Sequence, residues 1–339
     1  MKIILWLTVL LTLLHLPALA ARRWAKPLLA ALLVVDSLFL GLAAMEAYFT
    51  YAYDQSDGFD LTMAGHQWFA RHWQPLNSLG YRDQEPQAPA KGEKVLAVLG
   101  DSFAAGHGIN DPSQRFGDVL GRKLGQSFVV LNVAKCGWAT PEELDGLRSF
   151  PVRPDVVVLA YVLNDIYDAA REKNFPLAWD VRFPRSKFLK YLVDNSALVN
   201  FAYWRYYRLV NASVGEQDFW GSLKKAYQDP VVWARHRQEI EELAGYCRER
   251  HIRLLAVIFP MLPDVAGSAP LSAKVAQAFE EAGAQVLDLS PVLAGRDPKD
   301  MVVNANDAHP NEALNREVAG MLYPLVSSWS SQASDIGRK

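Results

Sequence analysis

Short apolar runs alternate with helical patterns from residue 94 onward, and this alternation restricts the fold more than any other feature of the chain. A short apolar run bounded by polar residues or glycine is typical of a buried strand. Strands that alternate with helices predict a parallel sheet with right-handed crossovers. The expected strands are 94–99, 128–133, 155–162, 252–259 and 285–289, and the expected helices are 114–124, 141–150, 231–250, 271–282 and 311–328.

The alternation stops between residues 167 and 229, where the chain becomes rich in aromatic residues. We interpret this segment as an insertion into the α/β domain. Aromatic residues at helical spacing usually pack against one another, which favours a small helical cap over the core. Two alternatives remain open: a lid along the substrate path, and contact with the outer leaflet of a membrane, where Trp and Tyr are enriched.

Two long apolar runs precede the α/β pattern, from Ile3 to Ala21 and from Leu28 to Met45. Each approaches the ~20 residues that a membrane-spanning helix needs, so we expect a transmembrane helical hairpin. The loop between them, 22–27, carries three cations, and acidic residues follow the second run, which places the loop in the cytoplasm. The rest of the chain would then face the periplasm or exterior from the cell inner membrane. A cleaved signal peptide ending near 18–20 is the alternative for the first run.

The overall charge excludes one class of partner. The net charge is -2, and no segment is rich in Lys and Arg, so we expect no nucleic-acid binding. The two cysteines, Cys136 and Cys247, are far apart and lack the spacing of metal ligands, so we expect two buried free thiols. We expect neither a metal nor a cofactor.

The first strand of the α/β pattern ends in Leu99-Gly100-Asp101-Ser102. Ligands of parallel α/β sheets bind at the carboxyl ends of the strands, so the Ser102 hydroxyl lies where chemistry is usually done. The glycine-bearing turn that follows, 103–108, allows a close backbone approach to a substrate. A helix-capping serine is the structural alternative. We interpret His107, within this turn, as part of a polar loop.

A serine becomes a good nucleophile only when a base takes its proton and a third group orients that base. The best candidates are His309, which precedes a proline, and Asp307, two residues before it. One loop would present both side chains. The alternative is a solvated aspartate beside a helix-capping histidine.

Donors for a developing oxyanion are also expected at strand ends. Gly137 follows the second strand and offers a bare N–H, and Asn164 follows the third strand and offers an amide NH₂. Each residue alone would be compatible with an ordinary turn.

Together, Ser102, Gly137, Asn164 and His309 form an ordered series that resembles the SGNH (GDSL) hydrolase family, membrane-anchored bacterial type, over about residues 94–328. The resemblance implies a flavodoxin-like three-layer α/β/α domain with a central parallel sheet. It also implies that Ser102 is the nucleophile and that its N–H, Gly137 and Asn164 form the oxyanion hole. His309 would be the base and Asp307 the acid that orients it.

Two positions depart from the family's usual pattern. Val162 stands where a glycine commonly lies two residues before the asparagine. Asn306 stands where the acid usually lies three residues before the histidine, whereas Asp307 matches the closer spacing of some membrane-associated relatives.

These features predict a serine esterase that removes an O-acyl group, expected to be acetyl, from an envelope glycan or lipid through an acyl-enzyme. An O-acyltransferase that moves the acyl group to a polysaccharide hydroxyl would use the same residues. A catalytically silent scaffolding protein is the third alternative. The expected organisation is a membrane anchor (1–49), a juxtamembrane segment and linker (50–93), a catalytic domain (94–329) with the insertion 167–229, and a polar tail (330–339).

Overall fold

The computed structural model describes residues 25–58, 62–178, 184–210 and 216–331. Their contacts divide them into two compact units. The smaller unit holds the described residues up to Gln55, with 62–67 and 184–210. The larger unit holds 56–58, 68–178 and 216–331.

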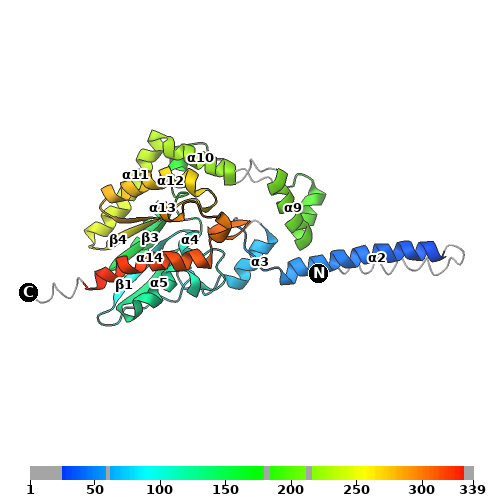
Figure 1. Ribbon diagram of the computed structural model, residues 1–339, viewed down its shortest axis with the longest axis horizontal. Helices are drawn as coiled ribbons and strands as arrows, with labels where there is room; N and C mark the ends of the chain where they lie inside the picture. The colour runs from blue at the N-terminus through cyan, green and yellow to red at the C-terminus, as the bar shows by residue number, and fades with distance from the viewer. Residues whose placement is uncertain (1–24, 59–61, 179–183, 211–215, 332–339) are drawn as a thin grey trace, which may run out of the picture. The chain divides into compact units, whose positions relative to one another are not determined.

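A five-stranded parallel sheet with the order β2-β1-β3-β4-β5 forms the centre of the larger unit (Figure 1). Gly100 at the end of β1 pairs with Ala134 of β2 and Ala160 of β3, so the carboxyl ends of three strands meet at one edge. The five strands are β1 (Lys94–Gly100), β2 (Phe128–Ala134), β3 (Val156–Val162), β4 (Arg253–Phe259) and β5 (Gln285–Asp288).

Both faces of this sheet are covered by helices, which is why its strands are almost continuously apolar. Leu99 of β1 belongs to one buried cluster and Val98 to the other, because successive side chains point to opposite faces. The fold is therefore the predicted three-layer α/β/α arrangement. One cluster includes side chains of α6 (Thr140–Ser149), α7 (Tyr167–Glu172), α10 (Glu216–Gln228), α11 (Pro230–Glu249) and α12 (Val265–Glu281), and the other those of α4 (Ser102–Ala105), α5 (Phe116–Leu124), α13 (Ser290–Leu293) and α14 (Glu312–Ser331).

Three elements differ from the sequence-based expectation. Helix α12 begins at Val265, not at 271, because Asp264 caps its N-terminus by accepting from the N–H of Gly267 at 3.0 Å. A short antiparallel pair, β6 (Val302–Asn304) and β7 (Asp307–Pro310), lies where we expected a loop. Helix α3 (Met63–His72) lies within the expected linker.

An apolar helix, α2 (Ala25–Ala47), leads the smaller unit and continues into a π-helical turn, Tyr48–Ala52. The stretch Ala30–Ala52 is long and apolar enough to cross a membrane. The first apolar run, 3–21, lies outside the described residues, so the structure shows one such helix and not the expected hairpin.

Part of the aromatic insertion belongs to this smaller unit as α8 (Lys187–Asn195) and α9 (Ala197–Val210). The carboxylate of Glu46 caps α9, since it accepts from the N–H groups of Ala197 at 2.9 Å and Leu198 at 3.0 Å. Phe49 stacks on Phe201 with their ring centroids 4.2 Å apart. The other end of the insertion, α10, packs into the core of the larger unit.

The larger unit extends N-terminally beyond residue 94, where the sequence places the start of the catalytic domain. Trp68 and Arg82 are each only 1% exposed, and both belong to this unit. Composition does not reveal this packing because the polar stretch 84–93 separates these residues from the first strand.

Candidate active site

Ser102 is the first residue of the short helix α4, directly after β1. Asp101 caps this helix, and its Oδ1 accepts from the N–H of Phe103 at 2.8 Å. Gly100 has φ 152°, and a Cβ there would lie 2.9 Å from the Cβ of Ala104 and 3.0 Å from the carbonyl oxygen of Ala160. The turn is therefore tight, and it presents the Ser102 hydroxyl at the carboxyl edge of the sheet.

Strand β7 brings His309 and Asp307 to this hydroxyl. The Nε2 of His309 lies 2.8 Å from the Oγ of Ser102, and its Nδ1 lies 2.5 Å from the Oδ1 of Asp307. A carboxylate oxygen only accepts, so Nδ1 carries the proton and Nε2 accepts from the serine hydroxyl. The structure thus brings together the three residues that the sequence proposes as nucleophile, base and acid. Asn306 is not in this chain of contacts.

Asp307 is held as a carboxylate. Burial alone would raise its pKa, but the charge of His309 and hydrogen bonds from His309 and Ser56 outweigh burial and lower the pKa below its ordinary value. The backbone N–H of His309 adds a second hydrogen bond to Oδ1 at 3.1 Å. The charged Asp307 can therefore fix the imidazole and stabilise its protonated form.

The three residues that carry candidate oxyanion donors, Ser102, Gly137 and Asn164, line one cavity with His309. Neither the N–H of Ser102 nor that of Gly137 donates to another group within the described residues. The amide of Asn164 donates one hydrogen to the Oδ2 of Asp101 at 3.1 Å, which holds the amide and leaves its second N–H for a ligand.

The cavity has a volume of about 490 Å³ and is mostly apolar. Val162, at the position where the family pattern has glycine, lines it from the end of β3. Phe103 also contacts the ring of His309, at 5.2 Å between centroids. The apolar lining includes Phe69, Phe103, Trp138, Phe219, Leu223 and Met261.

Three buried acids lie near the nucleophile. Burial raises the pKa of Asp101, and it raises the pKa values of Glu143 and Asp165 well above their ordinary range. Among the described residues, the side-chain oxygens of Glu143 and Asp165 have no hydrogen-bond partner. These two carboxyls are therefore neutral under conditions in which Asp307 is charged.

We expected His107 to be part of a polar loop, and it does lie in the turn after α4, but its side chain is packed inside the protein. It is buried and stacks on His309, with ring centroids 4.2 Å apart. Its Nε2 donates to the carbonyl of Asp57 at 3.0 Å, and burial, followed by the charge of His309, lowers its pKa to about 3. Nitrogen and oxygen atoms of His107, Asp307 and His309 lie within 4.8 Å of one another, a spacing that a metal ion also accepts. In this structure the Nδ1 of His309 donates to Asp307 and the Nε2 of His107 donates to the carbonyl of Asp57, so these nitrogens act as hydrogen-bond donors and not as metal ligands.

The expectation of two buried thiols is wrong for Cys136. This side chain is exposed and lines the cavity, because it lies in the turn that follows β2 rather than inside the sheet. Cys247 is buried as expected, and burial raises its pKa to about 12.

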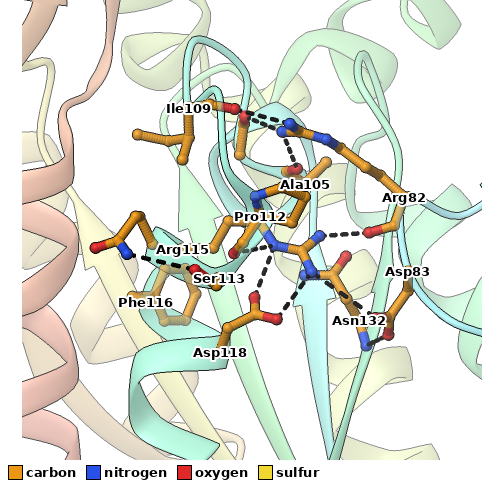
Figure 2. Close-up of polar contacts among 12 residues, drawn as sticks. Arg82, Asp83, Ala105, Ile109, Pro112, Ser113, Arg115, Phe116, Asp118 and Asn132 are labelled. Atoms are coloured by element: carbon orange, nitrogen blue, oxygen red, sulfur yellow. Dashed lines mark hydrogen bonds and ion pairs between the residues drawn. The ribbon is translucent and has the colours of Figure 1, made fainter. Parts of the chain in front are cut away.

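Sequence reasoning missed Arg82, which fixes the loop after the nucleophile (Figure 2). Its guanidinium donates to the carbonyl oxygens of Gly106 at 2.6 Å, Ile109 at 2.7 Å and His72 at 2.6 Å. It also lies 4.7 Å from the ring centroid of Trp73. Burial, followed by the charge of the neighbouring Arg115, lowers its pKa to about 10.

One sequence signal could have indicated this role. Arg82 ends the stretch Asn77-Ser78-Leu79-Gly80-Tyr81-Arg82, in which the side chain of Asn77 accepts from the N–H groups of Leu79 and Tyr81. Gly80 has φ 75°, which favours glycine. A fixed turn directly before an arginine indicates that the arginine has a defined position.

A hydroxyl, an imidazole and a carboxylate in hydrogen-bonded sequence, beside unpaired N–H donors, form the arrangement of a serine hydrolase. The comparison with known families agrees with this class. The chain belongs to the GDSL-like Lipase/Acylhydrolase family, whose sequence profile matches residues 98–316. It is therefore a hydrolase that acts on ester bonds.

The solved structures that match this chain share little sequence with it. TesA is 15% identical, with a TM-score of 0.42, and the match covers 68% of this chain and 97% of TesA. The psychrotrophic esterase EstA from Pseudoalteromonas sp. is 14% identical, with a TM-score of 0.40 and coverages of 70% and 98%. A carbohydrate acetylesterase family member from Sinorhizobium meliloti is 17% identical, with a TM-score of 0.38 and coverages of 69% and 97%. No curated protein sequence matches the chain.

Proposed function

We propose that this chain is a membrane-anchored serine esterase that works through an acyl-enzyme. The Oγ of Ser102 attacks the ester carbonyl while His309 Nε2 takes the hydroxyl proton. The tetrahedral intermediate then expels the alcohol, which receives that proton from His309. Water attacks the acyl-serine, again with His309 as base, and releases the carboxylic acid and the free Ser102 hydroxyl.

One observation carries this proposal. The Oγ of Ser102 and the Nε2 of His309 are 2.8 Å apart, and Asp307 lies behind the imidazole at 2.5 Å. Both distances are within reach of proton transfer and charge-assisted hydrogen bonding. The N–H groups of Ser102 and Gly137 and the amide of Asn164 would stabilise the oxyanion, which contributes about 3–4 kcal/mol per donor in enzymes of this type.

The proposed substrate is an O-acyl group on an envelope glycan or lipid, with acetyl as the expected acyl group. The support for this choice is location. The apolar stretch Ala30–Ala52 is suited to a membrane, and its C-terminal part carries Tyr48, Phe49 and Tyr51, aromatic residues that favour a membrane interface. The cationic segment 22–27, whose last three residues begin α2, would lie in the cytoplasm, and this would leave the catalytic unit on the outer side of the inner membrane.

The test of the chemistry is hydrolysis of 4-nitrophenyl acetate by the full chain in detergent, beside Ser102→Ala. We expect turnover by the parent protein and none above background by the variant. A fluorophosphonate probe should label Ser102 in the parent protein only. Equal turnover in both proteins would contradict the nucleophile assignment, and an inactive, unlabelled parent protein would favour a scaffolding role.

Three further measurements resolve the finer parts of the proposal. Addition of an acceptor polysaccharide, followed by mass spectrometry, distinguishes hydrolysis from transfer of the acyl group to a sugar hydroxyl. For the membrane, a reporter enzyme fused after Lys339 should be active only when it is exported, and cytoplasmic activity would refute the orientation. A cleaved first segment would appear as a shortened N-terminus in the purified protein.

A further inference from the structure

A short segment, Ser56–Gly58, packs against the chain that carries the catalytic acid. In sequence, this segment follows the apolar stretch that ends at Ala52. The N–H of Gly58 donates to the carbonyl of Asn306 at 2.8 Å, and the side-chain amide of Asn304 donates to the carbonyl of Ser56 at 3.1 Å. Two hydrogen bonds thus fix the segment against the residues that directly precede Asp307.

The hydroxyl of Ser56 donates to the Oδ2 of Asp307. Ser56 is 4% exposed and Asp307 is 0% exposed, so this contact is shielded from solvent. The other carboxylate oxygen, Oδ1, already accepts both hydrogen bonds from His309. Within the described residues, Ser56 is the one hydrogen-bond donor to Oδ2.

Among the residues that the structure describes, no neighbouring group replaces this hydroxyl. The Nε2 of His107 lies 3.8 Å from Oδ2, but its proton is directed to the carbonyl of Asp57 at 3.0 Å. The backbone of Gly108 packs closely against Oδ2 on another side. A Cβ at Gly108 would lie 2.8 Å from Oδ2 and 2.5 Å from the Cγ2 of Val303, so no side chain can enter between them to donate. Loss of the Ser56 hydroxyl would leave a buried carboxylate oxygen without a donor.

We propose that Ser56 is a positioning residue for the reaction: its hydroxyl fixes the Asp307 carboxylate so that Oδ1 faces the Nδ1 of His309. This inference rests on the proposed acyl-enzyme function. Without the serine donor at Oδ2, the carboxylate is no longer held in one orientation, and the imidazole then loses its fixed orientation. The segment that follows the apolar helix would therefore be part of the catalytic machinery and not a passive linker.

The experiment compares Ser56→Ala with the parent protein, both as full chains in detergent, by the pH dependence of kcat/KM for 4-nitrophenyl acetate. We expect kcat/KM to fall about 10- to 100-fold, the range found when a hydrogen-bond partner that orients a metal-binding histidine is lost. The acidic limb of the profile should move to lower pH, because a carboxylate that no longer faces Nδ1 stabilises the protonated imidazole less. A purely structural effect would not move that limb.

Two variants serve as controls. Ser56→Thr keeps a hydroxyl and should recover most of the activity. Ser290→Ala should leave kcat/KM unchanged, because Ser290 is equally buried, lies outside the cavity and has a hydroxyl with no partner among the described residues. If Ser56→Ala does not fold, Ser56→Cys replaces it, since a thiol of similar size is a weak donor.

A double variant tests whether Ser56 acts through Asp307. In an Asp307→Ala background, Ser56→Ala should cause no further loss of kcat/KM. A full additional loss there, or a wild-type profile for the single Ser56→Ala variant, would overturn the proposal. A parent protein that does not hydrolyse the ester would instead refute the proposed function, so the two failures are distinguishable.

Discussion

Two groups of buried acids near the same serine have opposite charge states. Asp307 accepts hydrogen bonds at both oxygens, and the net effect of its surroundings is to lower its pKa. Glu143 and Asp165 are equally buried, but their oxygens have no partner among the described residues, and burial raises their pKa values well above the ordinary range. The comparison shows that donors and nearby positive charge, and not burial, decide which acid is ionised here.

This difference has a consequence for the proposed chemistry. Attack by Ser102 creates a negative charge on the substrate oxygen, and additional charged carboxylates nearby would oppose it. Asp101 lies next to Ser102, and its charge is one cause of the raised pKa values of Glu143 and Asp165. Neutral Glu143 and Asp165 add no further negative charge to those of Asp101 and Asp307, and the charge of Asp307 stabilises the protonated His309.

The largest expected effect comes from removal of the charged acid. Asp307→Asn should lower kcat for 4-nitrophenyl acetate by about 10³- to 10⁴-fold, because an amide in place of the carboxylate favours the wrong imidazole tautomer. The measurement is steady-state hydrolysis with the active-site concentration determined by titration. Glu143→Gln is the matched control, since it changes a buried acid to its amide without removing a charge, and its kcat should stay within about threefold of the parent value.

The reverse outcome would break the comparison. If Glu143→Gln lost as much activity as Asp307→Asn, the buried pair of acids would take part in the reaction. If Asp307→Asn kept parent activity, Asp307 would not be the residue that orients His309.

Arg82 extends the comparison to a buried cation. Like Asp307, Arg82 has several hydrogen-bond partners, and its loss removes a charged donor from the carbonyl oxygens of Gly106 and Ile109. We expect Arg82→Met to lower the free energy of unfolding by about 2–4 kcal/mol. Urea unfolding of the full chain in detergent measures this change. Arg148→Met, at a half-exposed arginine paired with Asp145, should stay within about 0.5 kcal/mol.

The role of Arg82 follows from the structure, whereas other parts of the fold and of the candidate site could be predicted from the sequence. Ser102 and Asn164 both follow strands, and the carboxyl ends of parallel strands meet at one edge, so their proximity is predictable from periodicity. The three layers are predictable for the same reason. The spacing of Asp307 and His309 likewise allows one strand to carry both residues.

The rest depends on contacts that leave no periodic signal. Ser56 and Asp307 are 251 positions apart in the sequence, and a serine in a polar stretch has no feature that marks its partner. Arg82 and His107 are polar residues in irregular segments, which pattern reasoning assigns to the surface. Only the packing of aromatic residues such as Trp68 around them reveals that they are buried.

The smallest expected effect tests whether Glu143 is neutral in the folded protein. Because the pKa of Glu143 is higher in the folded protein than in the unfolded chain, folding retains a proton, and stability falls as pH rises above the unfolded value. Glutamine has no proton to lose, so the stability of Glu143→Gln relative to the parent protein should rise with pH, by at most about 1.4 kcal/mol per pH unit. Below the pKa of Glu143 in the unfolded chain, the stability difference should not depend on pH. Thermal unfolding at pH 5, 7 and 9 measures this, with Glu249→Gln, at an exposed glutamate, as the control. Parallel curves for Glu143→Gln and the parent protein would mean that Glu143 is ionised when folded, and burial without donors would then not keep an acid neutral at this site.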